Sequence, residues 1–397
     1  MKFETYKMED ALESLIDYRG KTPQKSNKGI MTLSAKSVRD GYIDYSQCYF
    51  ISEEEYKRFM VRGLPKVGDV LLTTEAPLGV VARLDRDDIA IAQRLLTLRG
   101  KEDILDTGYL YYYLKSSIGQ AKLRERESGT TVTGIKQAEF RKIMIDIPDI
   151  STQRKIASIM EGLDEKIKIN NEINDNLEQQ AQTLYQSIAN SSSQSVTLSD
   201  FMTIKHGYAF KGKHITFESN NVILVTPGNF KIGGGFQENR CKYFTSEYPS
   251  EYVLHPGDLI VTMTDLSKES DTLGYSALIP DNPERIYLHN QRIGLVQFIN
   301  NDIPKDYVYW FLRSYDYHMR IVGSASGSTV KHTAPSRILE QTIPVPSNLD
   351  KSQVLLLKDT DETIAHNELE IIKLSSIRDS ILPRLISGEL DVSGLDI

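Results

Sequence analysis

The feature that most constrains this chain is a narrow apolar stripe that runs through residues 151–188 without a proline. From Ile156 onward, the stripe positions follow one another at alternating steps of four and three residues, which is the period of a coiled-coil seam. The pattern predicts one long helix over residues 149–190. Because so narrow a stripe leaves most of the helix polar, it must be buried against another helix.

The second half of the chain repeats short segments of the first half in the same order. The matching pairs are Gly68–Thr73 with Gly257–Thr262, Gln93-Arg94 with Gln291-Arg292, Tyr109–Leu114 with Tyr307–Leu312, Ser128–Val132 with Ser326–Val330, and Ile147-Pro148 with Ile343-Pro344. Ordered matches at a nearly constant spacing indicate a tandem duplication.

The repeat also predicts the partner helix, over residues 348–388. We expect the two helices to pair antiparallel, because a whole domain lies between them in the sequence. Asn170 and Asn367 are polar seam residues, predicted to face each other and fix the register; the alternative is that they face solvent at a kink. The predicted seam consists of Ile156, Met160, Leu163, Ile167, Asn170, Leu177, Leu184, Ile188, Ile364, Asn367, Ile371, Leu374, Ile381 and Leu385.

The rest of the chain predicts an α+β fold, with two tandem α/β domains of short strands at residues 1–148 and 194–346 and a tail at 389–397. The two helices would separate the domains and give the chain an internal pseudo-two-fold symmetry. In the first domain, we expect a short amphipathic helix over Met8–Asp17 and a longer helix over Thr107–Arg126.

Composition limits the class of protein. The net charge is −7, and the excess acid lies in residues 348–397, which hold 5 basic and 10 acidic residues. The two globular segments are close to neutral, so tight binding of nucleic acid by this chain alone is not favoured, although a basic partner could supply the missing charge. No apolar run suits a membrane helix, the start of the chain does not resemble a secretion signal, and Cys48 and Cys241 are expected to be free thiols of a cytoplasmic protein.

No motif assembles a catalytic or metal site. Asp44, Glu55 and Lys57 have the D…E-x-K spacing of many metal-dependent nucleases, but a solvated helix face is the preferred interpretation. The histidines form no metal-binding motif, and methyltransferase motifs are missing. We therefore expect a binding protein.

If the ligand is duplex DNA, the candidate contacts are the cationic, amide and aromatic residues of the stretches that differ between the two halves. For any one of them, an ordinary solvated surface residue is the preferred interpretation. They are Lys21, Lys25, Lys28, Lys36, Arg39, Tyr42, Lys205, His206, Tyr208, Lys211, Lys213, Asn229, Lys231 and Arg240. The Ser-Gly-x-Thr-Val loops at Ser128 and Ser326 recur in both halves, which suits either contact with the DNA backbone or packing; packing is preferred.

The chain resembles the specificity subunit of Type I restriction–modification enzymes over nearly its whole length. The residues that carry the resemblance are Tyr18–Pro23, Asn290-Gln291-Arg292, the repeated segments above, Ile343–Pro346, Gln153–Ala157 and Arg378–Leu390. The last of these is similar to the terminal L-L-P-x-L-x-S-G-E of the family, whereas Asp350–Val354 departs from the E-Q-x-x-I-A that begins the family's helices.

The resemblance implies two target-recognition domains that each read one half of a bipartite, asymmetric site in double-stranded DNA. It further implies helices that set the spacing of the half-sites and dock two methyltransferase subunits, with restriction subunits as optional further partners. This chain would then bind no cofactor. S-adenosylmethionine would belong to the methyltransferase, and ATP and Mg²⁺ to the restriction subunit. The alternatives are a free-standing metal-dependent endonuclease using Asp44, Glu55 and Lys57, and a coiled-coil protein–protein adaptor.

Overall fold

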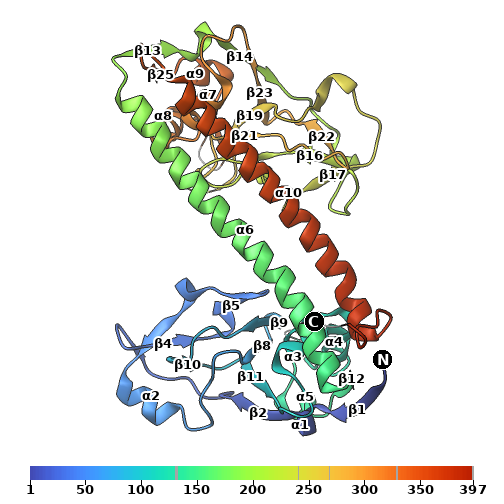
Figure 1. The fold of residues 1–397 in the computed structure, drawn as a ribbon. Helices are drawn as coiled ribbons and strands as arrows, with labels where there is room; N and C mark the ends of the chain where they lie inside the picture. The colour runs from blue at the N-terminus through green and yellow to red at the C-terminus, as the bar shows by residue number, and fades with distance from the viewer. Residues whose placement is uncertain (130–132, 240, 268, 328–329, 396–397) are drawn as a thin grey trace. The chain divides into compact units, whose positions relative to one another are not determined.

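The computed structural model describes residues 1–129, 133–239, 241–267, 269–327 and 330–395. It divides into two compact units, one made of Met1–Ile167 with Lys373–Ile397 and the other of Lys168–Ile372. Each unit contains a globular domain and parts of both long helices, α6 (Ile150–Asn190) and α10 (Lys351–Ser387) (Figure 1). No helix of the described residues is long and apolar enough to cross a lipid bilayer.

The first domain consists of short strands and short helices. Its strands are β1 (Phe3–Lys7), β2 (Leu12–Asp17), β3 (Lys25–Ser26), β4 (Ile30–Leu33), β5 (Val38–Arg39), β6 (Tyr42–Ile43), β7 (Tyr49–Ile51), β8 (Val70–Thr74), β9 (Leu78–Arg83), β10 (Ile89–Ile91), β11 (Leu95–Gly100) and β12 (Met144–Pro148). Its helices are α1 (Met8–Ala11), η1 (Ala35–Ser37), η2 (Tyr45–Gln47), α2 (Glu53–Phe59), α3 (Thr107–Lys115), α4 (Ser117–Arg124) and α5 (Gln137–Phe140).

The second domain has the same kinds of element. Its strands are β13 (Gln194–Thr197), β14 (Met202–His206), β15 (Ile215–Thr216), β16 (Val222–Val225), β17 (Lys242–Phe244), β18 (Val253–Leu254), β19 (Leu259–Thr262), β20 (Thr264–Asp265), β21 (Ser276–Leu278), β22 (Ile286–His289), β23 (Ile293–Phe298), β24 (Lys331–His332) and β25 (Thr342–Val345). Its helices are η3 (Leu198–Asp200), η4 (Gly212–His214), η5 (Pro227–Asn229), η6 (Ser250–Tyr252), α7 (Lys305–Phe311), α8 (Tyr315–Ser324) and α9 (Pro335–Leu339).

The main sheets of the two domains correspond, which confirms the predicted duplication, although the second domain has an additional strand, β18. The antiparallel sheet β2-β11-β8-β9 of the first domain corresponds to β14-β23-β19-β21 of the second. The other large sheets, β10-β4-β7-β3 and β15-β17-β16-β22-β18, each contain an equivalent parallel pair, β10 with β4 and β22 with β16. The pair β1–β12 likewise corresponds to β13–β25.

The repeated Gly-Asp motif has a local structural cause. Gly68 and Gly257 have φ angles of 90° and 76°, a conformation that glycine adopts without steric cost. The carboxylate of the following aspartate accepts a hydrogen bond from a backbone N–H of the turn, from Lys66 to Asp69 at 2.9 Å and from His255 to Asp258 at 2.8 Å. The motif thus starts the buried strands β8 and β19 in the same way.

Two predicted helices of the first domain are wrong in their bounds. Within the predicted helix Met8–Asp17, only Met8–Ala11 is helical (α1). The remaining residues form β2, which pairs with β11 and buries Ile16 in the sheet. The predicted helix Thr107–Arg126 is broken at Ser116, whose hydroxyl accepts a hydrogen bond from the N–H of Gly119 at 3.1 Å and caps α4. A short apolar run does not by itself distinguish a helix from a buried strand.

The helix pair is antiparallel, as predicted, and its seam is covered. In the second unit, Asn170 on α6 contacts Glu370 on α10, and Asn174 contacts Asn367, so the residue number falls on one helix as it rises on the other. In the first unit, Ile156 of α6 belongs to the same core cluster as Leu385 of α10. The predicted seam positions are all buried or partly buried in the structure.

The two seam asparagines, predicted to face each other, each form a hydrogen bond with a different residue of the opposite helix. Asn170 Nδ2 donates to Glu370 Oε2 at 2.7 Å, and Asn367 Nδ2 donates to Asn174 Oδ1 at 2.8 Å. Each asparagine therefore bonds to the other helix about one turn away from the predicted partner. The solvent-facing alternative does not hold for Asn170, which is 1% exposed.

Candidate nucleic-acid interface

The repeated Gln-Arg dipeptide and the repeated Ser-Gly loop meet at the end of the same strand. In the first domain, the N–H of Thr74 donates to the carbonyl of Arg94 at 3.0 Å, and the N–H of Ile135 donates to the carbonyl of Thr74 at 2.9 Å. The base of the loop is closed by two hydrogen bonds between Ser128 and Gly134, of 2.8 and 3.0 Å. We call this arrangement the arginine–loop module.

The second domain has the same module. The N–H of Met263 donates to the carbonyl of Arg292 at 2.9 Å, and the N–H of Thr333 donates to the carbonyl of Met263 at 3.0 Å. Ser326 and His332 exchange two hydrogen bonds of 3.0 and 2.9 Å. The described ends of both loops are thus held against their own sheet. Residues 130–132 and 328–329, which carry most of the repeated Thr-Val sequence, lie outside the described residues.

The side chains around the two modules differ. In the first domain, Glu75 is 2.9 Å from Arg94 and 3.6 Å from Arg19, and the Arg62 guanidinium donates to the carbonyl of Asp17 at 2.9 Å. This surface is therefore rich in arginine.

In the second domain, the hydroxyl of Thr264 lies 3.1 Å from Nδ1 of His332. Burial acts to raise the pKa of Asp265, but hydrogen bonds from the backbone N–H groups of Ser267 and Thr272 outweigh it and hold the pKa below its usual value. Arg292 is exposed in this domain.

A second repeated element is a small hairpin on the edge of each domain. Strands β5 and β6 form it in the first domain, and the bridge between Phe230 and Phe236 forms it in the second. The N–H of Gly41 donates to the carbonyl of Val81 at 2.9 Å, and the N–H of Gly235 donates to that of Ser276 at 2.8 Å. Both hairpins are thus attached to the edge strand next to them, β9 or β21.

A basic side chain holds the tip of each hairpin. In the first domain, Lys115 lies 3.1 Å from Asp40. In the second, Arg313 donates to the carbonyls of Gly233 and Gly234, each at 3.1 Å, and also contacts Glu178 of α6 at 3.0 Å. The second hairpin is therefore bound both to its domain and to the long helix within the same unit.

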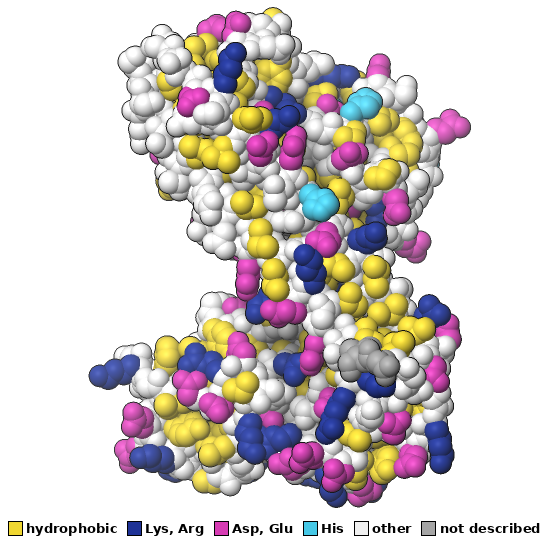
Figure 2. Space-filling view, viewed as in Figure 1, with side chains coloured by type: hydrophobic (Ala, Val, Ile, Leu, Met, Phe, Trp, Pro, Cys, Tyr) yellow, Lys and Arg dark blue, Asp and Glu magenta, His cyan; other side chains and the backbone are white. Residues whose placement is uncertain are grey.

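Most of the predicted DNA contacts lie on the surface, spread over several loops and strands. The exposed ones are Lys21, Lys25, Lys28, Lys36, Tyr42, His206, Tyr208, Lys211 and Lys213, and the partly buried ones are Arg39 and Lys205. On the face shown in Figure 2, basic and acidic side chains are interspersed and do not gather by sign. Charge alone therefore does not mark one contact surface on this face.

The three remaining predicted DNA contacts are Asn229, Lys231 and Arg240. Asn229 is fully buried, and its amide donates to the carbonyl of Gln237 at 3.2 Å, so its burial argues against contact with DNA. Lys231 is paired with Glu178 and Glu368 within its own unit. Arg240 lies outside the described residues.

Two of the three residues of the nuclease alternative, Asp44 and Glu55, are used in internal contacts, whereas Lys57 is exposed. Asp44 caps η2 and pairs with Arg39, while Glu55 accepts a hydrogen bond from the N–H of Gln24 at 3.0 Å and pairs with Arg58. Over the described ranges, no group of three or more His, Cys, Asp or Glu side chains could hold a metal ion. Nothing in this geometry favours the nuclease alternative.

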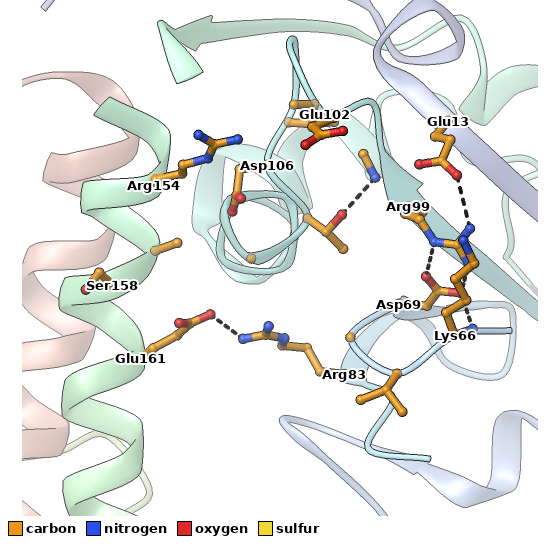
Figure 3. Close-up of a pocket in the computed structure, with 17 residues that line it drawn as sticks. Glu13, Lys66, Asp69, Arg83, Arg99, Glu102, Asp106, Arg154, Ser158 and Glu161 are labelled. Carbon is orange, nitrogen blue, oxygen red and sulfur yellow. Dashed lines mark hydrogen bonds and ion pairs between the residues drawn. The ribbon is translucent and has the colours of Figure 1, made fainter. Parts of the chain in front are cut away.

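A pocket of about 540 Å³ in the first unit lies where α6 passes the start of β8 and α3 (Figure 3). Two ion pairs lie among its charged side chains: Asp69 pairs with Arg99, and Glu161 pairs with Arg83. Asp106 caps α3 by accepting a hydrogen bond from the N–H of Tyr109 at 2.9 Å. The pair of Arg83 and Glu161 thus links the domain to α6 at this pocket.

Gln153, from the motif at the start of α6, explains how this helix is attached. Its amide donates to the carbonyls of Ile104 and Pro148, both at 2.8 Å, and its oxygen accepts from the N–H of Asp106 at 2.9 Å. The side chain is fully buried with its donors and acceptor satisfied. The sequence motif thus marks a structural joint.

The sequence-based choice of contacts did not include Arg94 and Arg292, which stand at equivalent places in the two arginine–loop modules. Both belong to the repeated dipeptide, but the candidates were taken from the stretches that differ between the halves. The repetition of the dipeptide was the available signal for this equivalence.

These observations define a class of protein: a duplicated α+β binding protein whose domains are each fastened to a pair of long antiparallel helices. A family model described as the Type I restriction modification DNA specificity domain matches residues 2–179 and again residues 190–375. The two matches cover most of the chain, so this chain belongs to that family.

Individual relatives agree with this assignment. The Type I restriction enzyme MjaIX specificity subunit of Methanocaldococcus jannaschii is 24% identical over 377 residues, which cover 87% of this chain and 82% of that protein. The MjaVIII specificity subunit of the same organism is 22% identical over 330 residues, or 77% and 75% of the two chains. The crystal structure of the S subunit of a Type I system from M. genitalium has a similar fold, with a TM-score of 0.61 at 16% identity over 97% of this chain and 96% of that one.

Proposed function

We propose that this chain is the DNA-specificity subunit of a Type I restriction–modification complex, in which each domain reads one half of a bipartite site in double-stranded DNA. The observation that carries the proposal is the duplication: the family's DNA specificity domain matches twice, and each copy presents an arginine–loop module. The chain itself performs no catalysis in this proposal.

The two half-sites differ in sequence, since the surfaces beside the modules differ. Strands β2 and β14 end at equivalent positions, and the residue two places further on is Arg19 in one domain and Tyr208 in the other. Glu75 contacts the first module, whereas Thr264 contacts the second. Different donors and acceptors beside the same framework suit two different base sequences.

The partners in this proposal are two methyltransferase subunits, which bind S-adenosylmethionine, and restriction subunits, which use ATP and Mg²⁺. The long helices set the spacing of the half-sites and dock the methyltransferases. This is supported by apolar side chains that the helices leave exposed in the second unit: Ile169 and Ile173 on α6 are 40% and 42% exposed, and Leu355 and Leu356 on α10 are 54% and 56% exposed. Exposed apolar clusters commonly mark protein-binding surfaces.

Exchange of the domains tests the proposal. Residues 1–148 would be replaced by the corresponding domain of a relative, and genomic adenine methylation would be mapped in cells that contain the methyltransferase. We expect one half of the methylated motif to change, and exchange of residues 194–346 to change the other half. A motif that stays the same in both exchanges would contradict the proposal and favour the coiled-coil adaptor.

A further inference from the structure

We infer that Arg94 and Arg292 are equivalent contacts to the phosphates of the DNA backbone, one in each domain. The inference rests on the proposed function and deepens it, because it separates anchoring of the DNA from reading of its sequence.

The first argument is the equivalence of the two arginines. Their carbonyls accept hydrogen bonds at 3.0 and 2.9 Å from equivalent residues, Thr74 and Met263, and the loops that follow are attached to the same two residues. Arg94 has a φ angle of +70°, which is unusual for a residue with a side chain. The structure thus holds an arginine at the same place in both domains, and in one of them against a backbone preference.

The second argument is that both guanidinium groups are accessible. The side chain of Arg94 is 53% exposed although Glu75 lies 2.9 Å from its Nε, and a carboxylate cannot use all five N–H donors of a guanidinium. Arg292 is also exposed, and its backbone N–H donates to the side chain of Asn290 at 3.1 Å, which fixes the turn that presents it. Guanidinium groups bind phosphate through two parallel hydrogen bonds.

The third argument is that the residues shared by the two domains should contact what the two half-sites share. The phosphate backbone has the same geometry in both half-sites, whereas the base edges differ. Contacts that read bases are therefore expected among the residues that differ, such as Arg19 and Tyr208. A contact common to both domains is expected at phosphate.

Measurement of DNA binding as a function of salt tests the assignment. The full-length chain, purified with the subunits with which it assembles, would be compared with Arg94→Gln, Arg292→Gln and the double variant on target and non-target duplexes. Loss of one phosphate contact should weaken binding of both duplexes by the same factor and reduce the slope of log K against log salt by about 1 for each arginine. The methylated motif should stay the same.

The matched control is Arg86→Gln, which changes an arginine at the other end of β10 whose side chain is 41% exposed and paired with Asp88. We expect this variant to keep the wild-type slope. Thermal unfolding of each variant would identify loss of the fold. An unchanged slope in folded Arg94→Gln and Arg292→Gln, or a relaxed motif in either, would overturn the inference and leave the proposed function in place. If the wild-type assembly itself bound no duplex, the proposed function would fail as well.

Discussion

Trp310 of α7 donates a hydrogen bond from its indole Nε1 to Oδ2 of Asp361 on α10, over 3.2 Å. The equivalent pair in the first domain consists of Tyr112, whose hydroxyl donates to Asp164 of α6 over 2.8 Å. Each domain is thus joined to the helix that follows it by an aromatic donor and an aspartate. The two aspartates have different surroundings, however, and these lead to different predictions.

Stability of the second unit should depend on the protonation of Asp361. Burial raises the pKa of this carboxyl to about 8, with Asp306 and Glu178 acting in the same direction and Arg313 opposing them. In the unfolded chain, the pKa would be about 3.9. Between these two values the folded state binds a proton that the unfolded state lacks. The free energy of unfolding therefore falls as the pH rises, by up to about 1.4 kcal/mol per pH unit, and levels off above pH 8.

The variant Asp361→Asn keeps an acceptor for Trp310 but cannot ionise. We expect it to be more stable than the wild type in urea at slightly alkaline pH and to have a flatter dependence of stability on pH. Asp164→Asn is the matched control and should lose stability, because Asp164 also pairs with Arg378 at 3.0 Å. An identical pH dependence in the wild type and Asp361→Asn would contradict this prediction.

Arg313 should be essential for the stability of the second unit. It is 7% exposed and pairs with Glu178 at 3.0 Å, and it lies over the ring of Trp310. Arg313→Ala would leave Glu178 without this partner and two glycine carbonyls without a donor, at a cost on the order of 3 kcal/mol. Arg313→Lys introduces the residue type that the first domain has at the equivalent position, Lys115. It should lose less stability than Arg313→Ala, because lysine keeps the charge although it lacks the planar guanidinium group. Urea unfolding measures both, and equal stability of the alanine variant and the wild type would argue against the role.

The asparagine pair in the helix seam should show strong coupling. Asn367→Ala removes the donor to Asn174, which is 4% exposed, so a buried polar group is left unpaired at a cost of about 1–3 kcal/mol. Replacing both Asn174 and Asn367 by leucine removes both polar groups and should recover most of this loss. A double-mutant cycle in urea gives the coupling energy; additive effects would show that the hydrogen bond does not act as described.

Glu55 should matter for stability and not for cleavage of DNA. The backbone N–H of Gln24 and the guanidinium of Arg58 hold the pKa of this carboxyl below its ordinary value. Its contribution to stability is therefore present above the ordinary pKa of a glutamate and is lost as the pH falls through the lower folded value. We expect Glu55→Ala to lower the melting temperature at neutral pH. We also expect the purified wild-type protein to leave DNA intact when Mg²⁺ is present. Metal-dependent cutting by the wild type that disappears in Glu55→Ala would restore the nuclease hypothesis.

Where sequence patterns were long, the predictions from them hold. The 3.5-residue period identified α6, and the repeat identified α10 as its antiparallel partner, because a periodic apolar stripe has few ways of being buried. Short patterns were less informative. Leu12–Asp17 forms a strand because it pairs with β11. Each seam asparagine forms its hydrogen bond about one turn away from the asparagine that it was predicted to face.

The candidate site shows the same division. Composition placed Asn229 and Lys231 among the DNA contacts, although one is buried and the other is paired with Glu178 and Glu368. Neither fact can be read from the neighbouring sequence, since burial and pairing are set by residues far away along the chain. Arg94 and Arg292 were visible as a repeat, but only the equivalent hydrogen bonds to Thr74 and Met263 show that the repeat is one structural module.

By itself, the sequence determined the duplication, the helix pair and the family of this protein, because these depend on periodicity and on ordered repetition along the chain. Only the tertiary structure decided which side chains are accessible and which are used internally. The physical reason is that an arginine or asparagine has the same chemistry in every sequence context. Whether it meets solvent, as Arg292 does, or a half-buried carboxylate and two carbonyls, as Arg313 does, depends on contacts between distant segments.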